Sequence, residues 1–323
     1  MENKKIIAMM LTLSMLAAAF AGCLGGDEED PEPEAVMGCM DATANNYNAD
    51  ATEDDGSCTH DPTWSITLAA DMGPVWVESG WDPIIPNLNA GEMCDAIISA
   101  MTKTEARDQV VDFTRAYYTS SQGVIGGSGS ASISDVSDLN AAGTIIGVQS
   151  GTTSDLYANE NLADATTTAY EDFPSVIAAL NNGDVHYAMG DAPVLSLEGD
   201  LMVTFSDENF GLAVREDSGE LLAALDVAIG AVVASGEYDA IYGAWFDGAV
   251  TLADDTTADT ATAYPTPSEG STLTSALESG GLKLCTDPFY PPFESYDADG
   301  NVEGFDADMA DAIVDEIAAH YMG

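Results

Sequence analysis

Arg107 is the side chain in this sequence best suited to hold a carboxylate. A guanidinium matches a carboxylate through two parallel N–H donors, and nearby hydroxyl and amide donors strengthen such a site. Thr102 stands at a predicted strand-to-helix turn and can supply both of these donors. Two alternatives stay open. Arg107 can form a surface ion pair, and Thr102 can open a capping box with Glu105 unless Thr104 caps the helix instead.

The segment 149–153, Gln-Ser-Gly-Thr-Thr, is a second candidate for contact with an anion. It follows a predicted strand and opens a predicted helix, so its backbone amides point outward at the positive end of the helix. Gly151 would let the backbone approach a ligand closely. The alternative interpretation is an ordinary capped helix start.

The charge balance of the chain is strongly acidic. Seven Lys and Arg residues face 56 Asp and Glu residues, which gives a formal net charge of −49 over 323 residues. Such a chain lacks the basic patch that binding to nucleic acid or to anionic lipid headgroups requires. The composition favours a salty habitat, in which salt screens the repulsion, over an acidic surface built for one cationic partner.

The sequence gives little support for catalysis or for a cofactor. It contains no Ser/His/Asp set and no Cys/His pair, and His60, His186 and His320 are scattered. A chain that nearly excludes cations but keeps a few in its body indicates a specific role for at least one of them. We therefore expect no cofactor and no catalytic metal.

The amino terminus predicts export. Lys4 and Lys5 precede an apolar run over 6–22, too short for a typical spanning helix but suited to a secretory signal. Cys23 follows small residues, and the segment resembles a lipoprotein signal over 1–22, with lipid attached to Cys23. The alternative is an uncleaved helix with an unmodified thiol. We expect the protein on the outer face of the cell membrane, with the lipid anchor as its only membrane attachment.

Residues 23–37 form a predicted acidic linker, and residues 38–58 a module bounded by Cys39 and Cys58. An exported location permits a disulfide between these two cysteines. The module resembles short Asn/Asp-rich modules of marine microbial surface proteins. Its carboxylates suit calcium weakly, since the spacing is not that of an EF-hand, and a stapled spacer is the favoured alternative. The calcium candidates are Asp50, Asp54 and Asp55.

Cys94 and Cys285 fall in apolar, strand-like runs. We expect them to be buried thiols rather than a metal-binding pair.

The body of the chain alternates between predicted strands and helices, which is typical of an α/β fold. The predicted strands are 74–78, 94–99, 122–126, 144–148, 186–189, 201–205 and 211–215. The predicted helices are 84–90, 105–112, 153–157, 173–181, 217–235 and 238–245. Residues 249–271 are rich in Thr, Ala, Asp, Ser and Pro and predict a linker.

Residues 272–323 start the α/β pattern again. They contain a predicted strand at 282–285, a proline-rich loop at 287–293 and a helix capped by Asp306. A parallel strand should follow this helix, and the strand predicted at 74–78 is the missing one. The last segment can therefore complete the sheet that the first segment begins.

Six segments taken together resemble family 3 of the extracellular solute-binding proteins, the polar amino-acid receptors of ABC importers. These segments are 81–91, 96–107 with 111–113, 147–153, 190–191, 210–215 and 286–294. The departure is one of order, because the block 286–294 normally opens the domain and here closes it. The chain therefore looks circularly permuted, or like parts of two tandem copies.

The resemblance implies an α/β fold with two lobes, of the type II periplasmic-binding-protein kind. Each lobe is a parallel-rich sheet flanked by helices, and two crossing segments form a hinge. Lobe 1 then begins with 63–125, and 126–206 forms lobe 2. Residues 207–248 return through the hinge into lobe 1, and 272–323 supply its permuted first strand and helix.

Matching motif positions implies the ligand contacts. Asp191 and the carbonyl of Ala100 would accept the ammonium of a free amino acid, and Thr153 would join the anion site. Trp81 and Tyr290 occupy the positions of two aromatic faces around the ligand, and Asp287 could reach a polar or cationic side chain. The alternatives are a surface acid for Asp191 and core packing for the two aromatic residues.

The function implied is an extracytoplasmic receptor that captures a free polar or cationic amino acid for the permease of an ABC importer. Contact with both lobes would favour hinge closure. Two other classes stay open: an enzyme on the same fold, such as a dehydratase, and a sensory or adhesive surface module.

Overall fold

The computed structural model describes residues 35–40, 46–54, 57, 65–253 and 255–323. The chain divides into two compact units, Met1–Thr63 and Trp64–Gly323. In the described part of the first unit, β1 (Met37–Gly38) pairs in parallel with β2 (Glu53–Asp54). Cys39 is disulfide-bonded. Its predicted partner Cys58 lies outside the described residues.

Several other predictions about the first unit also fall outside the described residues, namely the signal at 1–22, the lipidation of Cys23 and the calcium candidate Asp55. Asp54 is described by its backbone only, and Asp50 is exposed. The described residues contain no cluster of three or more His, Cys, Asp or Glu side chains arranged to hold a metal.

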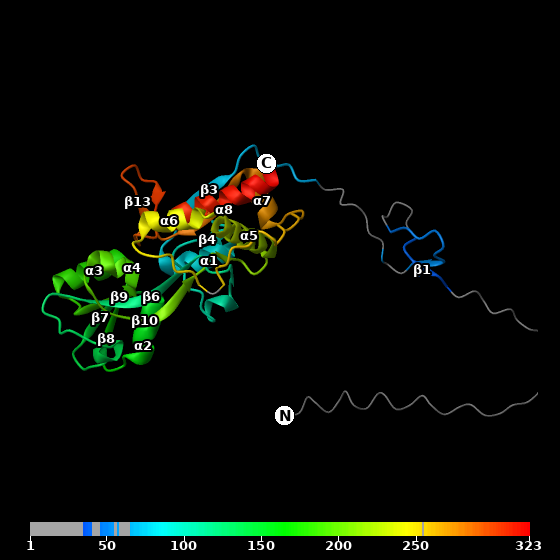
Figure 1. Cartoon of the computed structure of the whole chain (residues 1–323). Coiled ribbons are helices and arrows are strands. Elements are labelled where there is room, and N and C mark those ends of the chain that lie inside the picture. Colours follow the sequence, from blue (N-terminus) through cyan, green and yellow to red (C-terminus); the bar gives the residue numbers. More distant parts are fainter. Residues whose placement is uncertain (1–34, 41–45, 55–56, 58–64, 254) are drawn as a thin grey trace, which may run out of the picture. The chain divides into compact units, whose positions relative to one another are not determined.

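The second unit contains two five-stranded sheets, each flanked by helices (Figure 1). The first sheet has the order β3-β12-β4-β11-β5. Its strands are β3 (Gly73–Glu78), β12 (Gly281–Thr286), β4 (Ala96–Ile97), β11 (Ala213–Val214) and β5 (Asp112–Phe113). β12 is parallel to both β3 and β4, whereas β11 runs antiparallel to its neighbours.

The last segment of the chain therefore completes the first sheet within the same chain. β12 occupies the position between β3 and β4, and α8 (Phe305–Met322), drawn in red in Figure 1, packs beside β3. The other helices of this lobe are α1 (Trp81–Ala90), α5 (Gly219–Ser235), α6 (Glu237–Trp245) and α7 (Thr272–Ser279). A small hairpin joins β13 (Ser295–Tyr296) to β14 (Val302–Glu303).

The second sheet has the order β10-β6-β9-β7-β8. Its strands are β10 (Leu201–Phe210), β6 (Tyr118–Gly126), β9 (Tyr187–Asp191), β7 (Ile145–Gln149) and β8 (Thr166–Tyr170). Its helices are α2 (Thr153–Asn161), α3 (Phe173–Asn182), α4 (Ala192–Glu198) and the 3₁₀ turn η2 (Val136–Leu139).

The chain passes from the first sheet to the second through β6 and returns through β10, and these two strands pair side by side in antiparallel register. Aromatic residues anchor them to the first lobe. Tyr118 at the start of β6 stacks on Phe210 at the end of β10, with ring centroids 5.7 Å apart, and meets Phe293 edge-on at 5.0 Å. The anchor therefore includes a residue from the C-terminal segment.

Local sequence explains where the main helices begin and end. Asp172 accepts a hydrogen bond from the amide of Ser175 and so caps α3, which ends at Gly183 in the left-handed conformation. One face of α5 is apolar and buried, as expected for a helix that packs against a core. Its fully buried members include Leu221, Leu225, Ala228 and Val232.

Several predicted elements were wrong or were missed. Residues 105–112 do not form a helix. They contain only the 3₁₀ turn η1 (Arg107–Gln109), because pairing of β5 with β11 takes the chain back into the sheet at Asp112. Asp306 does not cap α8; it lies in the first turn of that helix with its side chain fully buried. The strand β8 and the helices α4 and α7 were not predicted.

Cys94 and Cys285 form a disulfide, so the prediction of two buried thiols was wrong. Their Cα atoms lie 5.6 Å apart although 191 positions separate them in the sequence. The bond joins the start of β4 to β12 and ties the C-terminal segment to the N-terminal part of the same sheet.

The predicted linker at 249–271 has no helix or strand among its described residues, apart from the cap of α7 at its end, but it packs against lobe 1. Asp255 forms an ion pair of 2.8 Å with Lys103, and the hydroxyl of Thr256 donates to the carbonyl of Ala116. In the described part of the chain no single helix is both long and apolar enough to cross a membrane. α5 and α6 meet that test only as a pair, across a bend of 83°.

Candidate functional site

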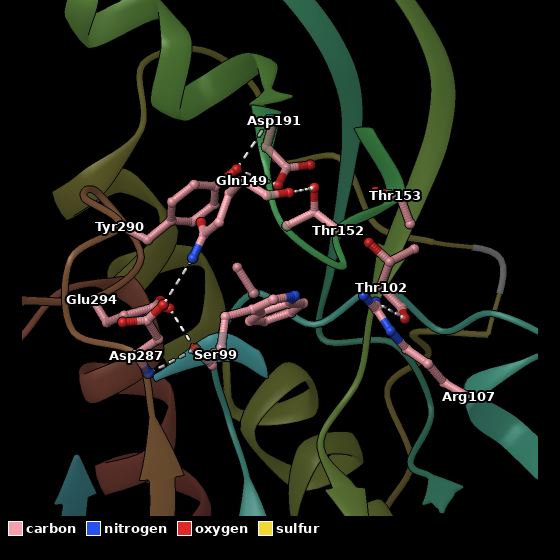
Figure 2. Close-up of a pocket in the computed structure, with 12 residues that line it drawn as sticks. Ser99, Thr102, Arg107, Gln149, Thr152, Thr153, Asp191, Asp287, Tyr290 and Glu294 are labelled. Atoms are coloured by element: carbon pink, nitrogen blue, oxygen red, sulfur yellow. Dashed lines mark hydrogen bonds between the residues drawn. The ribbon is translucent and has the colours of Figure 1, made fainter. Parts of the chain in front are cut away.

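A small cavity lies between the two lobes, where strands of both sheets end (Figure 2). Its walls come from the ends of β4 and β12 in lobe 1 and of β7 and β9 in lobe 2, with the first residue of α1. Ligands of open α/β sheets bind at such carboxyl ends. The lining residues are Trp81, Ser99, Ala100, Thr102, Arg107, Gln149, Thr152, Thr153, Asp191, Asp287, Tyr290 and Glu294.

The structure thus brings together every predicted ligand contact except Gly151. The sequence analysis did not name Ser99, Gln149, Thr152 and Glu294 as contacts, although all four belong to the motifs it used. The signal for Ser99 was its place in the segment 96–107, beside Ala100 at the end of a predicted strand.

Arg107 extends along the cavity wall without a carboxylate partner among the described residues. Its guanidinium donates to the carbonyl of Thr102 at 2.8 Å and, across the lobes, to the carbonyl of Gly151 at 3.3 Å. It also lies over the ring of Trp81, 5.0 Å from the centroid, in cation–π geometry. Burial lowers the pKa of Arg107 to about 10, so the group stays protonated at neutral pH.

Among the described residues, three other basic side chains form ion pairs with acids, and Arg107 forms none. Lys103, Arg115 and Arg215 each lie within ion-pairing distance of a carboxylate, and Arg107 does not. The alternative of a surface ion pair therefore does not describe this arginine. Its charge is available to the cavity.

Thr104, not Thr102, supplies the capping contact near Arg107. The hydroxyl of Thr104 accepts a hydrogen bond of 3.2 Å from the amide of Arg107. The hydroxyl of Thr102 bonds to no other described residue, and the neighbours of Thr102 make the backbone bonds to the strand of Phe210. The amide of Thr102 therefore points away from that strand, as in a non-hydrogen-bonded antiparallel pair.

Gly151 does not line the cavity, because its backbone is already engaged. Its amide donates to Oδ2 of Asp155 at 3.0 Å, and its carbonyl accepts from Arg107. Thr152 caps α2 by accepting from the amide of Asp155, so Thr153 becomes the first residue of that helix. The amides of Thr152 and Thr153 have no protein acceptor in the described residues, and these two residues do line the cavity.

Asp191 ends β9 and is nearly buried. Its Oδ1 accepts from Nε2 of Gln122 at 2.9 Å, and its Oδ2 accepts from the hydroxyl of Tyr290 at 2.7 Å. Burial raises the pKa of Asp191 to about 7; the hydrogen bond from Tyr290 opposes this shift, and the charge of Glu208 adds to it. Asp191 is therefore not one more surface acid.

Asp287 and Tyr290 meet lobe 2 from the C-terminal segment. Oδ2 of Asp287 accepts from Nε2 of Gln149 at 3.0 Å, and burial raises the pKa of Asp287 to about 6. The ring of Tyr290 packs edge-on against Phe173 of lobe 2 at 5.0 Å, whereas Trp81 faces Arg107. Whether Trp81 and Tyr290 enclose a ligand side chain stays a prediction.

Glu208 is a further buried carboxylate that the sequence analysis missed. It lies on β10 just after a register shift between Phe205 and Asp207. Ser206, within this shift, has a φ of 51°. One oxygen accepts from the hydroxyl of Ser206, and Oε2 has no donor among the described residues. A β-bulge changes the direction in which side chains point. The carboxylate of Glu208 lies close enough to Arg107 to raise the pKa of the guanidinium against the effect of burial.

Comparison with known proteins gives the same assignment as the sequence motifs. The sequence profile of the bacterial extracellular solute-binding proteins, family 3, matches residues 65–248 and 282–321. The match is interrupted at the segment that precedes α7 and resumes at β12.

Individual relatives are binding proteins by name. A probable histidine-binding protein of Neisseria gonorrhoeae is 29% identical over 265 residues, which cover 76% of this chain and 97% of that protein. The ABC transporter arginine-binding protein 1 of Escherichia coli strain K12 is 30% identical over 178 residues, 51% of this chain and 71% of that protein.

Among solved structures, an ancestral amino acid-binding protein described as a precursor of cyclohexadienyl dehydratase is similar. It has a TM-score of 0.50 and 31% identity over 53% of this chain and 77% of that chain. The prediction of a two-lobed, type II periplasmic-binding-protein-like α/β fold is confirmed. The chain belongs to family 3 of the bacterial extracellular solute-binding proteins.

Proposed function

We propose that the protein captures a free amino acid, polar or cationic, outside the cytoplasm and presents it to the permease of an ABC importer. One observation carries this proposal: Arg107, which has no carboxylate partner among the described residues, and Asp191 line the same cavity from opposite lobes. A zwitterion carries a carboxylate and an ammonium, and these two groups match its two charges.

In the proposed complex Arg107 holds the α-carboxylate through its planar fork, with the hydroxyl of Thr102 and the amide of Thr153 as additional donors. Asp191 accepts the α-ammonium, and so does the carbonyl of Ala100. The ligand's side chain then lies toward Asp287, between the faces of Trp81 and Tyr290. The carboxylate of Asp287 favours a ligand with a polar or cationic side chain.

Binding would favour closure of the lobes, because the proposed contacts come from both. The structure already has direct hydrogen bonds between the lobes, from Arg107 to Gly151, Gln149 to Asp287 and Tyr290 to Asp191. A ligand shifts such an equilibrium only by its differential affinity for the two states. We also propose that lipid on Cys23 holds the receptor at the cell surface near its permease, as the amino-terminal sequence predicts.

The test is a thermal-shift panel of the proteinogenic amino acids followed by calorimetric titration. A true ligand raises the melting temperature with its concentration. Arg107→Ala should abolish the shift, and Lys283→Ala, which removes an exposed cation from β12, should keep it. A melting temperature insensitive to the whole panel would contradict the proposal.

An enzyme on this fold is the competing function, favoured by the similarity to a dehydratase precursor and by an Asp191 pKa near neutrality. A group that titrates near the working pH suits acid–base catalysis. Turnover of prephenate-like acids, lost on Asp191→Asn, would replace the binding proposal with a catalytic one.

A further inference from the structure

Two carboxyl groups are buried together beneath the cavity. Glu294 lines the cavity wall and is 1% exposed, and Asp306 in the first turn of α8 is 0% exposed. Both belong to the C-terminal segment. A buried ionised carboxylate is costly unless it is paired or hydrogen-bonded, so the partners of these two groups decide their protonation.

One oxygen of each carboxyl fixes a residue that lines the cavity. The hydroxyl of Ser99 donates to Oε1 of Glu294 at 2.7 Å and accepts from the amide of Asp287 at 3.0 Å (Figure 2). Oδ2 of Asp306 accepts from the amide of Ala100 at 2.7 Å. Ala100 has a φ of 41°, in the left-handed region that non-glycine residues rarely adopt, so this bond helps to hold a strained backbone.

In the part of the chain that the structure describes, the second oxygen of each carboxyl has no hydrogen-bond donor. These two atoms are Oε2 of Glu294 and Oδ1 of Asp306, and both are buried. Each of these side chains acts on the pKa of the other, so the two carboxyl groups are neighbours in the buried site. A hydrogen bond between two carboxyl groups requires a proton on one of them, because two carboxylates offer acceptors only.

The described residues around the pair offer no ion pair that would stabilise two negative charges. The titratable groups that act on the pair are Asp287, Tyr290 and Tyr117, whose hydroxyl donates to Oδ2 of Asp306 at 2.9 Å. Among the described residues no Lys, Arg or His forms an ion pair with either carboxyl. Like charges in contact at a buried site cannot both ionise near neutral pH.

We propose that Glu294 and Asp306 share one proton, and that the shared proton holds Ser99 and Ala100 in their ligand-binding arrangement. The pair then carries one negative charge, and its hydrogen bonds position Ser99 and Ala100 at the cavity wall. Loss of the proton would leave two carboxylates that repel each other, and the hydrogen bonds to Ser99 and Ala100 would break. The effect on ligand affinity rests on the proposed function, whereas proton sharing itself does not.

The first experiment measures denaturant unfolding of the full-length chain from about pH 5 to about pH 9. The folded pair keeps a proton that the unfolded chain releases, so its contribution to stability falls as pH rises. One such proton changes the unfolding constant by about tenfold per pH unit. Glu294→Gln cannot release that proton and should remove this part of the slope, while Asp315→Asn, an exposed change on α8, should keep it.

The second experiment combines amide substitutions. In Glu294→Gln the amide nitrogen can donate to Asp306, and in Asp306→Asn it can donate to Glu294, so each single variant restores a bond between the two side chains. In the double variant two amide nitrogens face each other without an acceptor. We expect the double variant to lose more than about tenfold in the folding constant relative to either single variant, with a comparable further loss of affinity for the amino acid found in the panel.

These outcomes separate the two proposals. If the wild-type chain binds no amino acid but shows the proton-dependent slope, the proton-sharing pair stands and the transport function fails. If Glu294→Gln keeps the wild-type slope, or if the double variant is as stable as the single variants, the pair does not share a proton and the inference is overturned.

Discussion

The hydroxyl of Tyr290 donates a hydrogen bond of 2.7 Å to Oδ2 of Asp191, and the same hydroxyl oxygen accepts from the amide of Asp191 at 3.1 Å. Tyr290 belongs to the C-terminal segment of lobe 1, and Asp191 ends a strand of lobe 2. This pair therefore orients the proposed ammonium acceptor and bridges the two lobes at once.

Tyr290→Phe should weaken ligand binding by roughly tenfold to a hundredfold. The substitution removes a hydrogen bond to a charged group, worth about 1.5–3 kcal/mol, and leaves the ring in place against Phe173. Asp191 would retain only the bond from Gln122. Calorimetric titration with the ligand from the panel measures the loss.

Tyr296→Phe is the matched control, because the hydroxyl of Tyr296 also donates to an acid, Glu78, at 2.6 Å but lies outside the cavity. We expect wild-type affinity in this variant. Equal losses in both variants would mean that the bond from Tyr290 to Asp191 does not act at the ligand site.

The raised pKa of Asp191 predicts that ligand affinity depends on pH. Burial raises its pKa to about 7, so the folded protein without ligand keeps a proton that the unfolded chain releases above about pH 4. The contribution of this group to stability therefore falls as pH rises from about 4 to about 7. The ligand's ammonium favours the ionised form, so affinity should rise by up to about tenfold per pH unit below pH 7 and then level off.

Titrations from about pH 5.5 to about pH 8 check this expectation. Arg107 stays protonated throughout, since its pKa is about 10. Asp191→Asn should bind weakly and without this rise, and Asp200→Asn, an exposed change in the same lobe, should behave as wild type. A rise that persists in Asp191→Asn would assign the pH dependence to another group.

The disulfide between Cys94 and Cys285 should contribute strongly to stability. It closes a loop with a sequence separation of 191 and joins the segment that carries Asp287 and Tyr290 to the rest of lobe 1. The chain-entropy model gives about 5 kcal/mol for a loop of this size, and removal of native disulfides costs about 2–5 kcal/mol. Urea unfolding of Cys94→Ala/Cys285→Ala measures the loss.

Ligand affinity should fall in the same double variant, because Ser99 and Asp287 follow the two cysteines closely and hydrogen-bond to each other. Under mild denaturant, reductant should destabilise the second unit of the wild-type chain and leave the second unit of the double variant unaffected. Wild-type stability in the double variant would show that strand pairing alone holds the C-terminal segment.

Much of the site could be predicted because its residues follow strands whose apolar runs stand out in the sequence. Arg107, Asp191 and Asp287 all occupy such positions, and motif resemblance named them. The completion of the first sheet by the C-terminal segment was also predicted, since a parallel strand should follow the helix after 282–285 and residues 74–78 supply one.

The remaining features depend on long-range geometry. The cysteine pairing joins positions 191 apart, and nothing local distinguishes these cysteines from buried thiols. Glu208 is buried through an irregularity of β10 beside Ser206, which no spacing rule reveals. β8 was missed because it is an edge strand, bonded on one side only, and its Thr-rich sequence lacks alternation.

Gly151→Ala should weaken ligand binding by roughly tenfold, the loss expected from about 1.4 kcal/mol. Gly151 has a φ of 69°, where a Cβ costs about 1–2 kcal/mol. The added Cβ would also lie 3.1 Å from Oδ1 of Asp82 and 3.8 Å from the ring of Trp81. Since the carbonyl of Gly151 accepts from Arg107, a shift of this turn would displace the guanidinium.

Gly129→Ala separates strain from site geometry. Gly129 has a φ of 83°, but a Cβ there meets no atom within 4 Å. Both variants should lose about 1–2 kcal/mol of stability to backbone strain, and Gly151→Ala alone should lose affinity. Urea unfolding and calorimetric titration of the two proteins give the comparison. Equal affinities would mean that the turn at Gly151 does not position Arg107, and the guanidinium would then depend on Thr102 and Trp81 alone.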